Sequence, residues 1–257
     1  MNYLSYQSKD KFLRTWASER PYLNGAHLKY IAMFFMLLSH IAQTYFLYNL
    51  GPDYWKLADI FVFVGRISMP IFCFFTVQAI IFSRNISKYF VRMIIFALVS
   101  EIPFNLAFFD AVFYPERQNV ILTLLLGAVA VYAVDDLWKS DTNDILKILF
   151  AGLIVYLAYS LSNMWATDYA GKGIIAVFLL YLGRTSKIGT ALALLVGFYF
   201  EFQVYGWVIE NSYGFVYLAI PLLLLYNGKR GKQNKWAFYV FYPAHLFILY
   251  LLKLFII

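Results

Sequence analysis

Long apolar runs alternate with short polar segments along the chain, and this alternation predicts transmembrane helices. A helix needs about 17–25 predominantly apolar residues to cross a bilayer. Nine runs are candidates, at residues 30–48, 58–82, 92–109, 119–138, 145–163, 171–183, 188–207, 213–226 and 236–256. Two of them, 171–183 and 213–226, are short, so a re-entrant or partial span is the alternative there. The pattern therefore predicts an all-α, polytopic transmembrane helical bundle of about nine spans.

The pattern also bears on domain organisation, because no long polar insertion, low-complexity tract or clear internal repeat interrupts it. We expect one transmembrane domain over residues 28–257. Residues 1–27 precede it as a polar segment of mixed charge, without the short apolar stretch of a cleavable signal.

Composition agrees with this class of protein. Hydrophobic residues make up 62% of the 257 residues and charged residues only 14%, whereas a soluble domain carries about 25% charged residues. One globular core cannot hide this much apolar surface, which indicates an integral membrane protein. The single cysteine, Cys73, excludes a disulfide within the chain.

The net charge of +7 is explained by the loops between the predicted spans. Alternate segments hold 16 of the 21 basic residues: Lys9, Lys11, Arg14, Arg20, Lys29, Arg84, Lys88, Arg92, Lys139, Lys147, Arg184, Lys187, Lys229, Arg230, Lys232 and Lys235. The opposite loops keep only Lys56, Arg117 and Lys172. The positive-inside rule then places the N-terminus in the cytoplasm and, with nine spans, the C-terminus outside. We expect lipid, and no nucleic acid, as the partner of this charge.

Four ionisable side chains are predicted to reach a similar depth in four different spans. His40 lies eleven residues beyond Lys29, which is about three turns and roughly 16 Å along one helix face. Glu101, His245 and Arg66 fall near the middle of three other spans. Because buried charges in lipid are costly and mark functional sites, we interpret the four as a polar pocket. Simple packing of His40, an interfacial Arg66, and a structural Arg66–Glu101 pair remain alternatives.

The residue types in this pocket suit acyl transfer. A neutral imidazole can take a proton from a hydroxyl or amine as that group attacks a carbonyl. Arg66 or a second imidazole could then stabilise the oxyanion. Glu201 and Gln203 are predicted to line the outer half of the pocket. No nucleophile elbow, Walker loop, Rossmann glycine pattern or zinc-ligand spacing appears, so we expect no metal.

The basic turn LYNGKRGKQNK, residues 225–235, is a second candidate region. Its cations and flexible glycines could hold a phosphate-rich donor, with Lys229 and Arg230 as the candidate contacts. Topogenic charge alone explains the turn equally well.

Several short strings together resemble one known family. They are RISMPIF at 66–72, SEIPFN at 100–105, QNVILTLLLG at 118–127, DYAGKG at 168–173, LYNGKRG at 225–231 and FYPAHL at 241–246. With the opening LK…SHI, they resemble the TraX family of bacterial membrane proteins over about residues 28–250. That family is similar to wider membrane acyltransferases, in which a basic residue precedes a first-helix histidine. Lys29 and His40 occupy those places here, with Lys instead of the commoner Arg.

The resemblance implies transfer of an acetyl group from cytoplasmic acetyl-CoA to an acceptor at or across the bacterial plasma membrane. The founding member of the family is associated with N-terminal acetylation of conjugative pilin. The candidate catalytic residues are His40 as base, Glu101, Arg66 and His245. The candidate donor-binding residues are Lys29, Arg92, Lys229 and Arg230, and the candidate acceptor-binding residues are Asn119, Asp168, Tyr169 and Glu201. The acceptor does not carry over, so a pilin N-terminus, a glycan and another cell-surface polymer all remain open.

Two other functions use the same features. A proton-coupled transporter also places His and Glu within the membrane, although it predicts inverted repeats that the chain does not show. A noncatalytic assembly partner of surface machinery would be inert towards acyl donors. Turnover of acetyl-CoA distinguishes these hypotheses from the transferase.

Overall fold

The computed structural model describes residues 22–46, 52–206, 209 and 212–256, and almost all of its regular structure is helical. The α-helices are α2 (Gly25–Ile41), α3 (Trp55–Gly65), α4 (Ser68–Phe82), α5 (Ile86–Phe109), α6 (Val120–Leu137), α7 (Asp144–Met164), α8 (Ala170–Gly183), α9 (Lys187–Gly197), α10 (Ala219–Leu224) and α11 (Lys235–Ile256). Short helical turns are η1 (Ala42–Phe46), η2 (Pro52–Tyr54), η3 (Tyr199–Glu201) and η4 (Phe215–Leu218). Strands β1 (Gln203–Val204) and β2 (Ser212–Tyr213) form one antiparallel pair.

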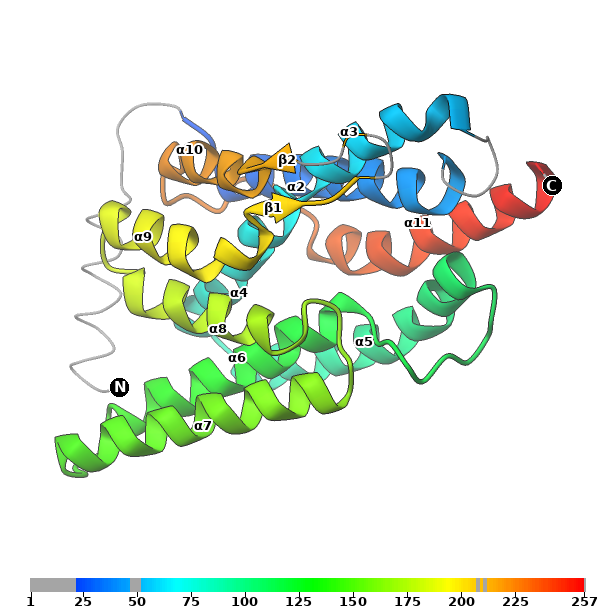
Figure 1. The fold of residues 1–257 in the computed structure, drawn as a ribbon. Coiled ribbons are helices and arrows are strands. Elements are labelled where there is room, and N and C mark those ends of the chain that lie inside the picture. Colours follow the sequence, from blue (N-terminus) through cyan, green and yellow to red (C-terminus); the bar gives the residue numbers. More distant parts are fainter. Residues whose placement is uncertain (1–21, 47–51, 207–208, 210–211, 257) are drawn as a thin grey trace.

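The helices form two groups with α4 between them (Figure 1). Helices α6, α7, α8 and α9 pack together on one side, and α2, α3 and α11 lie on the other. Helix α5 packs against both α11 and α6, and α4 packs against α2, α6 and α8. Elements far apart in the sequence, such as α2 and α11, therefore meet around the middle of the molecule.

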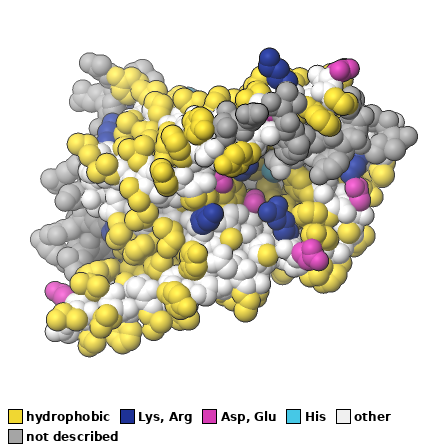
Figure 2. All heavy atoms as spheres, viewed as in Figure 1, with side chains coloured by type: hydrophobic (Ala, Val, Ile, Leu, Met, Phe, Trp, Pro, Cys, Tyr) yellow, Lys and Arg dark blue, Asp and Glu magenta, His cyan; other side chains and the backbone are white. Residues whose placement is uncertain are grey.

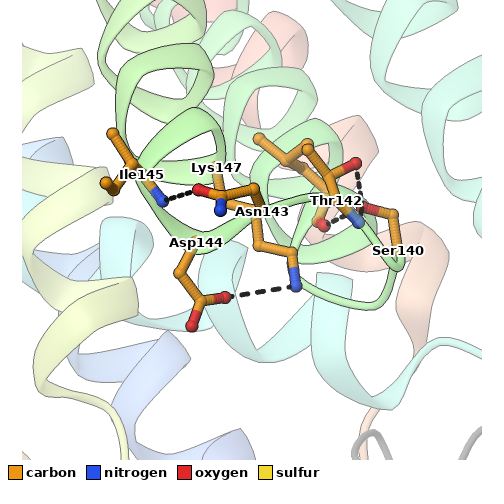
Figure 3. Close-up of polar contacts among 7 residues, drawn as sticks. Ser140, Thr142, Asn143, Asp144, Ile145 and Lys147 are labelled. Carbon is orange, nitrogen blue, oxygen red and sulfur yellow. Dashed lines mark hydrogen bonds and ion pairs between the residues drawn. The ribbon is translucent and has the colours of Figure 1, made fainter.

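Asparagine residues set the start of several helices. The side-chain oxygens of Asn24, Asn85 and Asn119 accept hydrogen bonds from backbone N–H groups in the first turns of α2, α5 and α6. Figure 3 shows the same arrangement in the turn before α7, where the Asn143 side chain accepts from the Ile145 N–H at 2.9 Å. Such caps satisfy donors that a helix leaves unpaired at its N-terminus, so these helices begin directly after their asparagines.

The all-α membrane class is confirmed, but the count of nine spans is not. Among the described residues, six helical segments are long and apolar enough to cross a bilayer: Gly25–Tyr45, Pro52–Phe82, Ile86–Phe109, Val120–Leu137, Asp144–Met164 and Trp236–Phe255. Three further apolar segments are shorter: Ala170–Gly183, Lys187–Gly197 and Phe215–Leu224.

The predicted span 188–207 shows why the observed number of long helices is smaller than the predicted number of spans. Its helix α9 has 11 residues, or roughly 16 Å at 1.5 Å per residue, before the chain turns into η3 and β1. The apolar run was long enough to predict a span, but tertiary packing ends the helix early.

The buried fraction differs strongly between helices at the centre of the bundle and helices at its outer face. In the segment Pro52–Phe82, which contains α3 and α4, 72% of the most apolar window is buried, against 22% for α7. The exposed side chains of α7 are mainly large and apolar, as expected for a helix that faces lipid. Figure 2 shows a largely hydrophobic face in which basic and acidic side chains gather around a hollow.

Candidate functional site

Two histidines from helices at opposite ends of the sequence form the centre of the site. His40 Nδ1 of α2 and His245 Nε2 of α11 lie 2.7 Å apart, and the two rings are inclined by only 5°. His245 Nδ1 lies 2.7 Å from the backbone carbonyl oxygen of Phe241, one turn earlier on α11. The intramembrane histidines that the sequence placed at similar depth are therefore in direct contact.

These contacts define which nitrogens carry hydrogen when both rings are neutral. A carbonyl oxygen only accepts, so His245 Nδ1 is the donor to Phe241 and His245 Nε2 has a free lone pair. His40 Nδ1 must then donate to His245 Nε2, which leaves the lone pair of His40 on Nε2. The ring of His40 lines a cavity, and its Nε2 is the nitrogen suited to take a proton there.

The helix around His40 is held closely against α3. A Cβ atom added at Gly65 would lie 2.3 Å from the Cβ of Ser39, so only glycine permits this approach. Directly after Ile41, the chain continues as the π-helical turn η1, and the Thr44 hydroxyl donates to the His40 carbonyl at 2.7 Å. π-Helical turns are often found at functional sites. Both features fix the backbone that carries the imidazole.

His40 opens onto a cavity of ≈ 220 Å³, which we call the small cavity. Its charged lining residues are Arg66, Arg117 and Asp168, and Tyr169 also lines it. The ring of Phe108 contacts the His40 ring edge-on, with centroids 5.3 Å apart. The small cavity thus combines one imidazole with charged and aromatic groups.

Arg66 reaches the small cavity because the second predicted span is broken. The pyrrolidine ring of Pro70 clashes with a helical carbonyl four residues earlier, which is that of Arg66. The chain makes i→i−3 bonds there instead, from Arg66 N–H to Phe63 O and from Ile67 N–H to Val64 O, both 3.2 Å. Helix α3 therefore ends at Gly65, and the Arg66 side chain turns into the cavity.

The partner of Arg66 is Glu201. Arg66 Nη1 lies 3.2 Å from Glu201 Oε2, and Tyr169 also hydrogen-bonds the guanidinium. Burial raises the pKa of the Glu201 carboxyl, and the nearby Arg66 acts in the opposite direction. The alternative that Arg66 pairs with Glu101 is wrong, because Glu201 occupies that position.

The loop before α8 presents Asp168 and Tyr169 in a strained conformation. Ala166, Tyr169 and Ala170 all have positive φ angles of 46–63°, a region that non-glycine residues enter at a cost. Backbone bonds to Gln118 hold the loop, from Gln118 N–H to Ala166 O at 3.1 Å and from Asp168 N–H to Gln118 O at 2.9 Å. Such strain is typical of functional sites.

Asp168 in this loop is half-buried and lines the small cavity. Burial raises its pKa, and the positive charges of Arg66 and Arg117 act in the opposite direction. The carboxyl therefore holds a proton more readily than an exposed aspartate does.

Glu101 and Asn119 were predicted to belong to the pocket around His40, but the structure pairs them with each other outside the small cavity. Both Asn119 N–H, at 3.4 Å, and the Asn119 side-chain amide donate to Glu101 Oε2, and the amide also donates to Ala97 O at 2.8 Å. Neither residue lines the small cavity. The pair instead joins α5 to the start of α6, and the next residue, Val120, does line it. Glu101 therefore does not meet His40 within the cavity.

A second cavity has a volume of ≈ 840 Å³, and we call it the large cavity. Five basic side chains line it, and no acidic one does among its described lining residues: Lys29, Arg84, Lys88, Arg92 and Arg230. Lys88 and Arg92 are four residues apart on α5 and share one helix face. Fixed positive charge of this kind suits a ligand with several phosphates.

Lys29 is held inside the large cavity by aromatic rings. Its Nζ lies 4.7 Å from the centroid of Phe75 and 5.3 Å from that of Phe238, and it donates to Gln233 Oε1 at 3.2 Å. Lys229 lies outside the cavity lining, and its backbone carbonyl accepts from Gly25 N–H at 2.8 Å. The turn after α10 thus contributes one of its two predicted cations, Arg230.

The two cavities share three apolar lining residues, Met36 of α2, Phe72 of α4 and Val120 of α6. We call this junction the neck. His40 lies one helical turn beyond Met36 on α2. Sequence reasoning missed the neck, because single apolar residues in apolar spans carry no distinguishing signal. It also missed Arg84 and Lys88, which it counted only as loop charge.

Helices of membrane-spanning length around a partly buried histidine pair and two cavities with charged lining residues define a polytopic membrane protein with an internal candidate site. The chain matches the family model described as "TraX protein" over residues 24–253. It belongs to the TraX family, a bacterial family of membrane proteins.

One relative of the chain is named for fimbrial assembly. The chain is 30% identical over 251 residues to "Probable fimbrial assembly protein FimC, serogroup H1" of Dichelobacter nodosus, a match that covers 89% of this chain and 95% of the relative. No solved structure matches the chain.

Proposed function

We propose that this protein is an acetyltransferase that moves an acetyl group from acetyl-CoA to a hydroxyl or amine acceptor. The observation that carries the proposal is the histidine pair, which leaves His40 Nε2 free on a ring that lines the small cavity. A base in a polar cavity that shares lining residues with a cationic cavity suits transfer between two substrates.

The large cavity is the proposed donor site. Coenzyme A carries several phosphate charges, and five basic side chains line this cavity. Its volume of ≈ 840 Å³ falls within the roughly 300–1,000 Å³ range of ligand pockets. Arg84 and Arg230 belong to loops that the positive-inside rule places in the cytoplasm, which is the compartment that we expect for the donor.

The small cavity is the proposed acceptor site. Arg117, Asp168 and Tyr169 come from loops that the same rule places outside the cytoplasm. The acetyl group would then cross at the neck, in the bacterial plasma membrane. The name of the fimbrial relative supports an acceptor in a surface fibre, such as a pilin N-terminus, and a glycan or polymer hydroxyl fits the same chemistry.

The proposed reaction uses one proton relay. The acceptor O–H or N–H gives its proton to His40 Nε2 while its oxygen or nitrogen attacks the thioester carbonyl carbon. Arg66 stabilises the oxyanion, because His245 Nε2 is already engaged with His40. The carbon–sulfur bond then breaks, and the proton on His40 Nε2 passes to the thiolate, which releases free CoA and the acetylated acceptor.

A proton-coupled transporter is the alternative function. A partly buried histidine pair beside one of two neighbouring cavities also fits a proton-coupled transport site. A transporter would move substrate across the membrane without consuming acetyl-CoA. A noncatalytic assembly partner would neither move substrate nor consume acetyl-CoA.

The test measures CoA release and label transfer by purified protein, incubated with labelled acetyl-CoA and membrane extract. We expect wild type to release CoA and to label an acceptor, and His40→Ala to lose roughly 10³-fold in kcat/KM. His27→Ala is the matched control, because His27 is exposed at the start of α2 and lines neither cavity. Full activity in His40→Ala would show that the base is assigned wrongly.

A further inference from the structure

The neck separates two spaces of very different size. The large cavity measures ≈ 840 Å³ and the small cavity ≈ 220 Å³, and Met36, Phe72 and Val120 line both. The ring of Tyr242 of α11, which lines the large cavity, lies 6.2 Å from the ring of His40, measured between centroids. Apolar side chains from three helices thus lie between the two cavities.

This arrangement determines which part of an acyl thioester reaches His40. Five basic side chains and no acidic one among the described lining residues face the large cavity, whereas the small cavity sets Arg66 and Arg117 against Asp168. We therefore expect the phosphates to bind in the large cavity. Only the apolar acyl end suits the neck, which has no charged side chain. The acyl carbonyl must meet His40 and the acceptor atom in the small cavity.

Space in the small cavity is limited in a way that bears on acyl length. Its ≈ 220 Å³ is below the roughly 300 Å³ of ordinary ligand pockets, and it must hold the acyl group and the acceptor together. Every methylene added to the acyl group takes volume from the acceptor. Close-packed walls cannot yield without strain.

We propose that the neck, with Phe72 as its largest side chain, is the acyl-length filter of this protein. The inference rests on the proposed function and goes beyond it. Short acyl groups pass Phe72 and leave room for the acceptor, whereas longer acyl groups are excluded from the small cavity. The large cavity binds the nucleotide portion of all these donors equally, because it does not contact the acyl end.

The experiment compares kcat/KM for acetyl-, butyryl- and hexanoyl-CoA in wild type and in Phe72→Ala. We expect wild type to prefer acetyl-CoA, and Phe72→Ala to raise the butyryl-to-acetyl ratio roughly tenfold, the scale of methylene discrimination in apolar pockets. Phe90→Ala is the matched control, because Phe90 is likewise half-buried and lines neither cavity. Its ratio should equal that of wild type.

A second variant, Val120→Ala, covers the case in which Phe72→Ala does not fold, and it should shift the ratio in the same direction by a smaller factor. An unchanged ratio in a folded neck variant, with acetyl-CoA turnover intact in wild type, would overturn the filter and leave the proposed function standing. Wild type that releases no CoA from any of the three donors would overturn both.

Discussion

The large and small cavities use charge in opposite ways. The large cavity carries basic side chains with no acidic one among its described lining residues. In the small cavity, cations and carboxylates are mixed, and Arg66 is already paired with Glu201 at 3.2 Å. A net positive charge attracts an anionic ligand over a long range. Paired charges of opposite sign act mainly at short range, where they hold the side chains of the cavity in position. We infer that the large cavity serves affinity and the small cavity serves geometry.

The histidine pair gives the sharpest test of geometry in the small cavity. His245→Leu should lower kcat/KM roughly 10³-fold, because it leaves His40 without the acceptor that orients it. His245→Gln should recover part of this loss, since its amide oxygen can accept from His40 Nδ1–H. Steady-state kinetics would check the rate, and calorimetry should give an unchanged Kd for acetyl-CoA in both variants. Equal losses in the two variants would contradict a positioning role.

A second prediction concerns Arg66 as the oxyanion donor. Arg66→Gln should lower kcat roughly 10²-fold with little change in KM for acetyl-CoA, because the lost interaction forms only in the transition state. Lys56→Gln is the control, since Lys56 is exposed on α3 and lines neither cavity. If Arg66→Gln raised KM alone, Arg66 would belong to acceptor binding instead.

The cations of the large cavity should show the opposite kinetic signature. Lys88→Gln and Arg92→Gln should each raise the Kd for acetyl-CoA about fivefold, which corresponds to about 1 kcal/mol, and leave kcat unchanged. The effect should decrease with added salt, as titration calorimetry at two ionic strengths would show. Lys139→Gln is the control, because Lys139 pairs with Asp135 at 2.7 Å and lines neither cavity. A Kd equal to that of wild type in both variants would place the donor elsewhere.

The last prediction concerns stability alone and comes from a single added methyl group beside His40. Gly65→Ala would place a Cβ 2.3 Å from that of Ser39, so we expect a loss of roughly 1–3 kcal/mol in the free energy of unfolding. Gly152→Ala is the control, because a Cβ there meets nothing within 4 Å. The Tm measured by thermal unfolding in detergent should be lower than that of wild type only for Gly65→Ala. Equal Tm values would mean that the α2–α3 contact is looser than the structure indicates.

Much of the site could be predicted from spacing. His40 and His245 were assigned to one depth from their distance to the span ends, and the structure brings them within 2.7 Å. For Arg66 the spacing left an interfacial position as the alternative, and the structure places it in the lining of the small cavity. The role of each residue in catalysis remains a prediction.

Other parts depended on packing that spacing cannot express. Glu101 was expected beside His40 but bonds to Asn119, because depth along a helix does not specify which face a residue occupies relative to its neighbours. The prediction of span length was wrong for a similar reason, since the helix in the apolar run 188–207 has only 11 residues.

The sequence by itself determined the membrane class and the similar depth of the two histidines, because hydropathy and helical rise are local properties. Only the tertiary structure decided that His40 and His245 touch, that Arg66 pairs with Glu201, and that Met36, Phe72 and Val120 form a neck between two cavities. These features join helices distant in sequence, and their contacts follow from how the helices rotate and pack against one another.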